Sequence, residues 1–278
     1  MLKNKITIKD IQKFKNQRKP FATITAYDYI SALKADMVDI PLILVGDSAA
    51  MVVYGMDTTI PISMDELIFL VRAVSRGNKK ALIVADMPFM SYQASIEDAV
   101  RNAGRFIKEG GAEAIKLEGG AVYENQIKAI IDAGIPVVGH IGLLPQSYYL
   151  SSGYRLQGKT QLEADKIFND AIVIQNSGAF AIVLEGIPDD LADKITQNLK
   201  IPTIGIGAGP HCDGQIQVFH DIMGLNSKTP PKHSKCYGNL GNEMQEILFK
   251  YKIDVEENRF PKQRHQNSSK IVNTKKQK

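Results

Sequence analysis

The sequence predicts an α/β fold of the (β/α)8 TIM barrel type, with an extra N-terminal helix that caps the bottom of the barrel. Three observations predict it. Eight short apolar runs recur along the chain, a helical stretch follows each run, and no change of composition divides the 278 residues into two blocks. This length is typical of one barrel domain, and 44% hydrophobic residues supply a sizeable core. We therefore expect a single domain over residues 1–258.

The expected strands are apolar almost throughout. Residues 42–45 and 181–184 lack the polar alternation of surface strands, as expected for parallel strands that are covered on both faces. Repeated units of strand and helix favour a closed barrel over an open doubly wound sheet. The predicted strands cover residues 21–28, 41–48, 81–89, 114–119, 136–141, 179–186, 201–208 and 215–220.

Helix boundaries are also marked in the sequence. Ser63 stands three residues before Glu66, and Thr160 stands three before Glu163, which is the reciprocal capping arrangement of a helix start. The N-terminal helix is expected over residues 7–17. Glycines that follow periodic segments predict helix ends at Gly77, Gly110, Gly134 and Gly178.

The formal charge of +4 comes from the C-terminal end. Seven Lys and Arg, and no acidic residue, lie between Arg259 and Lys278; without these seven, 27 basic residues face 30 acidic ones. We expect residues 259–278 to be a disordered basic tail, with no nucleic-acid or membrane partner. A nucleic-acid-binding protein is the competing interpretation, and it predicts salt-sensitive binding that is lost when the tail is deleted.

The two cysteines, Cys212 and Cys236, match neither a zinc motif nor a disulfide framework, so we expect reduced thiols. The first ten residues lack the continuous apolar core of a signal peptide. No apolar run approaches the roughly 18 residues that a membrane span needs. The sequence therefore predicts a cytoplasmic protein.

Polar side chains stand where the expected strands end, and in a (β/α)8 barrel the reactive groups lie at these C-terminal ends. Carboxylates that converge there repel each other unless a cation lies among them or some are protonated. The strand-end residues are Asp28, Asp47, Ser48, Asp86, Lys116, Glu118, His140 and Glu185.

Asp47, Asp86 and Glu118 supply oxygen ligands only, which a hard divalent cation prefers. Magnesium is the first expectation, and manganese also fits. Each aspartate taken alone could instead cap the helix that follows its strand. Caps do not require apolar strands to stop repeatedly at a carboxylate, so the set favours a metal site.

The other polar strand ends suggest separate roles. Lys116 should point to the same side as Glu118 and could hold a substrate carboxylate or oxo group, or close a structural salt bridge. His140 could donate to the substrate or be a hydrogen-bonded core residue. Glu185, after an apolar strand, suits a general base, with a rim ion pair as the alternative.

Two loops add weaker signals. The glycine-rich residues 205–209 could hold phosphate on backbone amides or form a tight turn. A long loop with Tyr148, Tyr149 and Tyr154 follows the fifth expected strand, and a barrel loop of this length favours a lid.

Six segments in this order and spacing resemble ketopantoate hydroxymethyltransferases, over residues 13–251. Each segment alone would be weak, but the ordered set is highly specific. The segments read FATITAYDY (21–29), VGDS (45–48), ADMPFM (85–90), IKLEGG (115–120), GHIGLLPQ (139–146) and IGIGAG (204–209).

The resemblance implies transfer of a one-carbon unit from 5,10-methylenetetrahydrofolate to the 2-oxo acid 3-methyl-2-oxobutanoate, giving 2-dehydropantoate for pantothenate and coenzyme A. The family pattern implies magnesium and substrate binding at Asp47 and Asp86, and a metal ligand at Glu118. It further implies substrate binding at Ser48 and Lys116, and a proton acceptor at Glu185. A magnesium-stabilised enolate would connect these roles. The resemblance also implies a homo-oligomer, a decamer.

Three positions depart from the family pattern, which usually has Gly where this chain has Ala50, His at Met56 and Phe at His233. They flank the site and affect loop packing or folate fit more than the reaction class. The competing enzyme class is a magnesium-dependent lyase or mutase resembling isocitrate lyase or phosphoenolpyruvate mutase. Those enzymes commonly use a catalytic cysteine near the rim, and no expected strand ends at a cysteine.

Overall fold

The computed structural model describes residues 4–225, 231 and 233–261, and its eight strands form a closed parallel barrel in the order β1 to β8. Every predicted strand is present, mostly with shorter ends. The predicted (β/α)8 fold is therefore confirmed. The strands are β1 (Phe21–Thr25), β2 (Leu42–Val45), β3 (Leu82–Asp86), β4 (Ala114–Lys116), β5 (Val137–Gly142), β6 (Ala181–Glu185), β7 (Thr203–Ile206) and β8 (Gly214–Gln217).

Closure depends on the contact between β1 and β8. Phe21 is paired with Gly214 and Ile24 with Gln217, so β8 continues the sheet back to its first strand. A Cβ atom at Gly214 would lie 2.7 Å from ring atoms of Phe21, so only glycine allows the two strands to approach at this point.

The interior of the barrel is filled by apolar side chains. They leave a cavity of about 10 Å³, which is no larger than one water probe. The barrel is therefore a packed core and not a channel, and substrates can reach only its ends. The side chains around this cavity are Leu42, Leu44, Val84, Lys116, Val138, Val183, Ile204 and Ile216.

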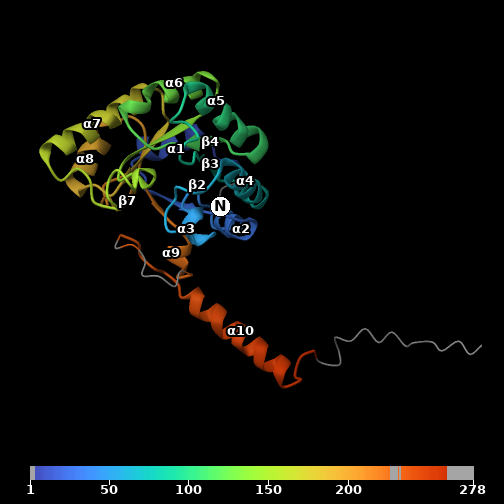
Figure 1. Ribbon diagram of the computed structural model, residues 1–278. Helices are drawn as coiled ribbons and strands as arrows, with labels where there is room; N and C mark the ends of the chain where they lie inside the picture. Colours follow the sequence, from blue (N-terminus) through green and yellow to red (C-terminus); the bar gives the residue numbers. More distant parts are fainter. Residues whose placement is uncertain (1–3, 226–230, 232, 262–278) are drawn as a thin grey trace, which may run out of the picture.

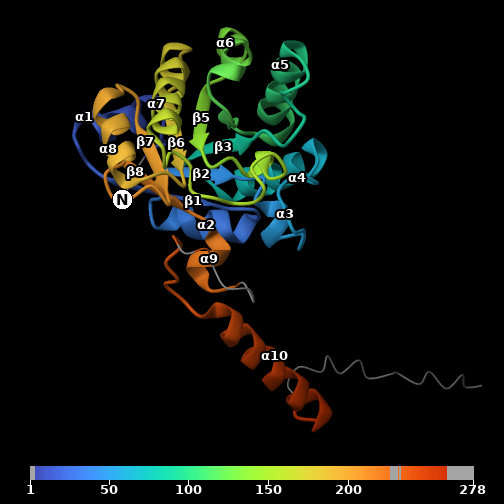
Figure 2. The same ribbon diagram turned by 60° about the vertical axis from the view of Figure 1, so that its left-hand side comes forward.

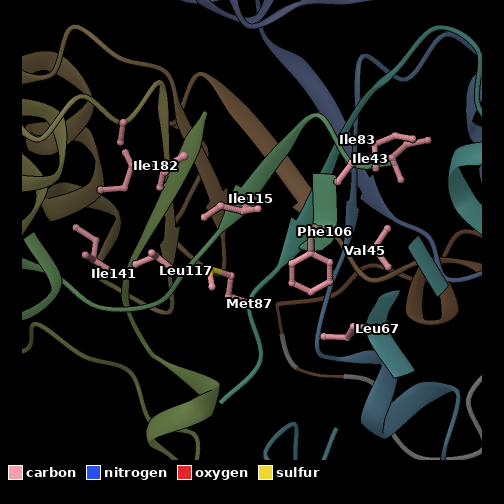
Figure 3. Close-up of a cluster of buried hydrophobic side chains, with 14 of the residues drawn as sticks. Ile43, Val45, Leu67, Ile83, Met87, Phe106, Ile115, Leu117, Ile141 and Ile182 are labelled. Atoms are coloured by element: carbon pink, nitrogen blue, oxygen red, sulfur yellow. The ribbon is translucent and has the colours of Figure 1, made fainter. Parts of the chain in front are cut away.

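Helices surround the barrel (Figure 1), and a second apolar core lies between them and the strands (Figure 3). The predicted capping boxes are present at Ser63 and Thr160. The helices are α1 (Ile8–Asn16), α2 (Tyr29–Met37), α3 (Ala49–Val52), α4 (Met64–Gly77), α5 (Ile96–Arg105), η1 (Phe106–Gly110), η2 (Ala121–Tyr123), α6 (Glu124–Asp132), η3 (Pro145–Ser147), α7 (Gln161–Asn176), α8 (Asp189–Asn198), α9 (Phe219–Met223) and α10 (Leu240–Glu256).

Helix α1 caps the bottom of the barrel, as predicted. Ile11 is fully buried and belongs to the same apolar cluster as the side chains of the barrel interior. Lys15 Nζ donates to Asp213 Oδ2 at 2.9 Å, which ties the helix to the segment that enters β8. Apolar packing, this ion pair and hydrogen bonds such as that from Gln12 Nε2 to the Lys200 carbonyl therefore hold the cap in place.

The last two units differ from the expected pattern of strand and outer helix. Residues 207–213 connect β7 to β8 without a helix, so the helical stretch expected after the seventh strand is wrong. Only the five-residue α9 follows β8 directly, and the 17-residue α10 points away from the barrel in both views (Figures 1 and 2). No residue of α10 is buried. The single domain over residues 1–258 stays a prediction, and residues 262–278 of the predicted tail lie outside the described residues. No described helix is long and apolar enough to cross a membrane.

Candidate active site

The predicted site residues come together at the C-terminal ends of β2 to β6. Asp86, Lys116 and Glu185 are the last residues of β3, β4 and β6, and His140 lies within β5. Asp47 and Glu118 follow β2 and β4 by two residues. All of these side chains are buried except Glu185, which is partly exposed at the mouth.

Lys116 is the cationic centre of this group. Its Nζ lies 2.7 Å from Asp86 Oδ1 and 3.9 Å from Glu118 Oε1. Lys116 and Glu118 thus point to the same side of their strand, as the two-residue spacing predicted. Lys116 thus forms the structural salt bridge that was one of its two expected roles, with Asp86 as its partner. Its role toward substrate stays a prediction.

Asp47 is held from two directions. Its backbone N–H donates to Asp86 Oδ2 at 3.2 Å, and its side-chain Oδ2 accepts from Gln146 Nε2 at 3.0 Å. These bonds join the ends of β2 and β3 to the loop that follows β5. The Asp47 and Asp86 carboxylates are consequently fixed side by side.

His140 stands between two carboxylates. Its Nδ1 lies 3.4 Å from Glu118 Oε1, and its Nε2 lies 3.2 Å from Glu185 Oε2. Neither pair meets strict hydrogen-bond geometry, so both are close ionic contacts. The imidazole therefore connects the buried carboxylate of β4 to the partly exposed carboxylate of β6.

Burial and mutual repulsion set the protonation of the cluster. Burial, followed by the charges of Asp86 and Glu118, raises the pKa of Asp47 well above 3.8. Burial also raises the pKa of Asp86, against the opposing charge of Lys116. Burial acts the same way on Glu118, but contact with His140 and the charge of Lys116 outweigh it and lower its pKa. Burial disfavours the His140 imidazolium, yet Glu118 and Glu185 raise its pKa to about 9.

The donor set fits a hard divalent cation. Among the described residues, the four carboxylates of the cluster lie beside two basic groups, Lys116 and His140, so acidic groups outnumber basic ones. Glu118 Oε1 is buried and has no donor in hydrogen-bond geometry among the described residues. In that same part of the chain, no three carboxylate, imidazole or thiol side chains are already arranged to hold a metal ion. Water or substrate oxygens would have to complete the coordination.

Ser48 and Asp28 have different surroundings, although both follow a strand. Ser48 Oγ lies 2.8 Å from the hydroxyl of the buried Tyr27, at the edge of the cluster. Asp28 is exposed, and its Oδ1 accepts from Ser31 N at the start of α2. The inclusion of Asp28 among the converging carboxylates is therefore wrong, because the helix-cap role takes its side chain away from the site.

The loops around the mouth include the two weaker sequence signals. Tyr148 and Tyr154 pack with ring centroids 5.0 Å apart, and Tyr154 has a pKa raised to about 12 by burial and then by Asp47. The tyrosine loop therefore lies over the carboxylates, and its closing as a lid stays a prediction. Gly207 has φ +62° in the glycine-rich loop and lies against His233, so a tight turn explains this glycine.

The other two departures lie beside the site. Ala50 is fully buried in α3, the short helix that starts after Ser48, and Met56 packs against the outer core. Both make apolar contacts behind the carboxylates and neither interrupts the helix. Their effect on folate binding and rate stays a prediction.

Three residues of the site were not assigned from the sequence. Gln146 bonds Asp47, Tyr92 bonds the backbone of Glu118, and Tyr27 bonds Ser48. Tyr27 stands at the end of a predicted strand, where its position could have identified it. Gln146 is the last residue of the motif GHIGLLPQ and lies in η3, and Tyr92 lies in the loop after β3. Only the tertiary structure shows that both contact the site.

Comparison with known sequences gives a consistent result. The chain matches the family described as ketopantoate hydroxymethyltransferase over residues 5–263. It is 50% identical over 264 residues to a 3-methyl-2-oxobutanoate hydroxymethyltransferase of Geobacter metallireducens, covering 95% of this chain and 99% of the relative. It is 53% identical over 253 residues to the Clostridium acetobutylicum protein of the same name, covering 91% of each chain.

Comparison with solved structures identifies the same fold. The chain is similar to phosphonopyruvate hydrolase in complex with oxalate and Mg++, with a TM-score of 0.60 and 13% identity, covering 92% of this chain and 100% of the other. It is also similar to 2,3-dimethylmalate lyase, a PEP mutase/isocitrate lyase superfamily member, with a TM-score of 0.56 and 14% identity, covering 95% and 91%. At these identities the likeness concerns the fold alone.

Proposed function

Because this chain belongs to the ketopantoate hydroxymethyltransferase family and is a hydroxymethyltransferase of the pantothenate pathway, we propose that it uses 5,10-methylenetetrahydrofolate as the one-carbon donor. The acceptor is 3-methyl-2-oxobutanoate and the product is 2-dehydropantoate. One observation supports this most: the Glu185 carboxylate stands at the mouth, 3.2 Å from His140, beside a buried acidic cluster. That geometry suits removal of a proton beside a carbonyl that is held in the cluster.

Magnesium is the cation that we assign to the cluster. Asp47, Asp86 and Glu118 offer oxygen donors only, and the fold neighbour described with oxalate and Mg++ supports this choice. A divalent ion bound here would withdraw electron density from the 2-oxo acid and make its C3 proton more acidic. Because no protein-only ligand set is preformed in the described residues, substrate oxygens or water would have to complete the coordination.

The protein residues orient the 2-oxo acid and move its proton. Lys116 and Ser48 hold its carboxylate and oxo oxygens, and Asp47 and Asp86 would reach the same oxygens through the divalent cation. Glu185 accepts the proton from C3, and the charged His140 orients the Glu185 carboxylate and stabilises the negative charge that develops on the substrate. The resulting enolate carbon bonds to the methylene carbon of the folate after one of its two C–N bonds has opened. Water then supplies the hydroxyl group as the second C–N bond breaks and tetrahydrofolate leaves.

The competing lyase or mutase chemistry receives no support from the cysteines. Cys212 precedes β8 and is buried at the bottom of the barrel, where burial raises its pKa to about 11. Cys236 is exposed in the segment before α10. Neither thiol lies at the C-terminal end of a strand, so the acid and base groups of the site are carboxylates and imidazole.

Turnover of defined substrates tests the proposal. Purified protein with Mg²⁺, 3-methyl-2-oxobutanoate and methylenetetrahydrofolate should form 2-dehydropantoate, detected by mass spectrometry. Without folate, the same mixture in D₂O should exchange the C3 proton, which isolates the proton-transfer step. A folded protein that gives neither product nor exchange would refute the assignment, and exchange without product would refute the folate step alone.

Helix α10 supports self-association. Met244, Ile247, Leu248 and Phe249 are each more than half exposed on it, and no described part of the chain covers them. Exposed apolar side chains of this number are typical of an interface. We propose a homo-oligomer in which a second copy covers α10; the decamer and the cytoplasmic location stay predictions from the sequence.

A further inference from the structure

Gln146 makes polar contacts inside the site through both polar atoms of its side chain. Its Nε2 donates to Asp47 Oδ2 at 3.0 Å and to the carbonyl of Met87 at 2.9 Å. Its Oε1 accepts from Gln93 Nε2 at 3.1 Å and lies 3.0 Å from the Tyr92 hydroxyl, whose single proton is shared with the Glu118 carbonyl at 2.9 Å. Both amide protons of Gln146 are thus used.

These partners fix the orientation of the amide. The Met87 carbonyl and the Asp47 carboxylate are acceptors, so they require the nitrogen of Gln146 on their side. Gln93 offers an N–H on the other side, so it requires the oxygen there. A flipped amide would set acceptor against acceptor at Met87, which is costly because Gln146 is 95% buried.

The backbone of the same residue reaches a second carboxylate. The N–H of Gln146 donates to Glu118 Oε2 at 3.0 Å. The Tyr92 hydroxyl, which contacts the Gln146 amide, also accepts from the backbone N–H of Glu118 at 3.1 Å. One residue in the loop after β5 therefore joins acids that come from the ends of β2 and β4.

We propose that Gln146, supported by Tyr92, is a positioning residue that sets the Asp47 and Glu118 carboxylates for divalent-cation and 2-oxo acid binding. This inference rests on the proposed function. Gln146 donates to Asp47 Oδ2 through its side-chain amide and to Glu118 Oε2 through its backbone N–H. The second oxygen of Asp47 is left for a cation or a water. Glu118 Oε1 lies 3.4 Å from His140 Nδ1 and has no donor in hydrogen-bond geometry among the described residues.

A neutral donor suits this position. Asp47, Asp86 and Glu118 repel each other in a buried site, and each must present an ionised oxygen to a cation. A second lysine would neutralise the site and compete with the metal, whereas an amide stabilises a carboxylate without changing the net charge. Partners of metal ligands at such positions typically contribute a factor of 10–100 in metal affinity.

The test replaces Gln146 by methionine, which has a similar length and no donor. We expect Gln146→Met to weaken Mg²⁺ and 3-methyl-2-oxobutanoate binding, measured together by titration calorimetry, by about 10–100-fold. The backbone N–H to Glu118 persists in this variant. At saturating Mg²⁺ and substrate, kcat should therefore change less than about 3-fold while the KM for the 2-oxo acid rises.

Two controls separate positioning from packing. Gln157 lies in the same connection, and its Nε2 donates only to the carbonyl of Arg155 among the described contacts, so Gln157→Met should bind and turn over like the parent. In an Asp47→Asn background, Gln146→Met should add less than a 3-fold loss of binding, because it acts through Asp47. A packing role would give the same added loss in both backgrounds.

Tyr92→Phe keeps the aromatic ring and removes the hydroxyl, so it tests the same network if the methionine variant does not fold. We expect a 3–10-fold loss of Mg²⁺-dependent binding at an unchanged melting temperature. Parent-like binding in a folded Gln146→Met or Tyr92→Phe, an equal loss in the Asp47→Asn background, or a parent that binds no Mg²⁺ would overturn the inference. Calorimetry needs no turnover, so a parent that binds but forms no 2-dehydropantoate would refute the proposed function and leave this test intact.

Discussion

The two ends of the barrel differ in how their acidic and basic side chains are balanced. At the bottom, Asp213 Oδ2 accepts from Lys15 Nζ at 2.9 Å, from Thr203 N at 2.8 Å and from Thr203 Oγ1 at 3.1 Å. One acid faces one cation, and hydrogen bonds supplement the pair. At the top, Asp86, Glu118 and Glu185 share Lys116 and His140, and Asp47 adds a fourth carboxylate beside Asp86.

This difference separates stability from function. The balanced pair at the bottom joins α1 to the start of β8. The top keeps more negative charge than its own cations neutralise, which costs folding free energy and attracts a cation. Buried charges that lower the stability of the fold in this way are characteristic of functional sites.

The largest expected effect is at the proton acceptor. Glu185→Gln should lower the rate of C3 exchange by about 10²–10⁴-fold, because an amide cannot accept the proton. Binding of Mg²⁺ and 2-oxo acid should stay near the parent value, since Glu185 lies outside the group proposed to bind the metal. Exchange followed by NMR in D₂O checks this, and retained exchange with lost binding would reverse the roles of Glu185 and Asp86.

The next effect concerns a proposed metal ligand. Asp86→Asn should weaken Mg²⁺-dependent binding of the 2-oxo acid by about 100-fold or more, since even an outer partner of a ligand contributes 10–100-fold. Calorimetric titration with and without Mg²⁺ measures it. Unchanged Mg²⁺ dependence in a folded variant would remove Asp86 from the metal site.

The protonation of His140 at the C-terminal end of the barrel should make the free energy of unfolding depend on pH. The pKa of His140 is raised from 6.5 to about 9 in the folded chain. Its stabilisation is then fully present below pH 6.5 and is lost as the pH rises through 9, by up to about 3 kcal/mol. Urea unfolding with EDTA at pH 6 and pH 9.5 measures this loss, and His140→Gln should flatten it. An equally steep loss in that variant would assign it to other groups.

The smallest effects should have opposite signs at the two ends. Asp213→Asn should lower the free energy of unfolding by about 2 kcal/mol without changing kcat, because Lys15 loses its buried partner. Without metal, Asp47→Asn should raise that free energy by about 1 kcal/mol, because it removes one of the repelling acids. Denaturant titrations of both variants check the signs, and destabilisation by both would contradict the comparison.

Local patterns predicted the strands and most of the acidic cluster well. Residues 42–45 and 181–184 are apolar because both faces of a barrel strand are covered, so their composition identifies them. Asp86 and Glu185 end such strands, and barrel geometry alone then brings them to one rim. Asp28 follows the same pattern and was wrongly included, because the sequence does not say whether a side chain turns inward or caps a helix.

The sequence alone determined the order of the eight strands, the rim on which the acids gather and, through its ordered motifs, the enzyme family. Those properties follow from short-range patterns of burial, capping and strand ends. Only the tertiary structure decided that His140 bridges Glu118 and Glu185, that Gln146 joins Asp47 to Glu118, and that α10 stands away from the barrel. These contacts join residues from different strands and loops, and their distances depend on how the whole barrel closes.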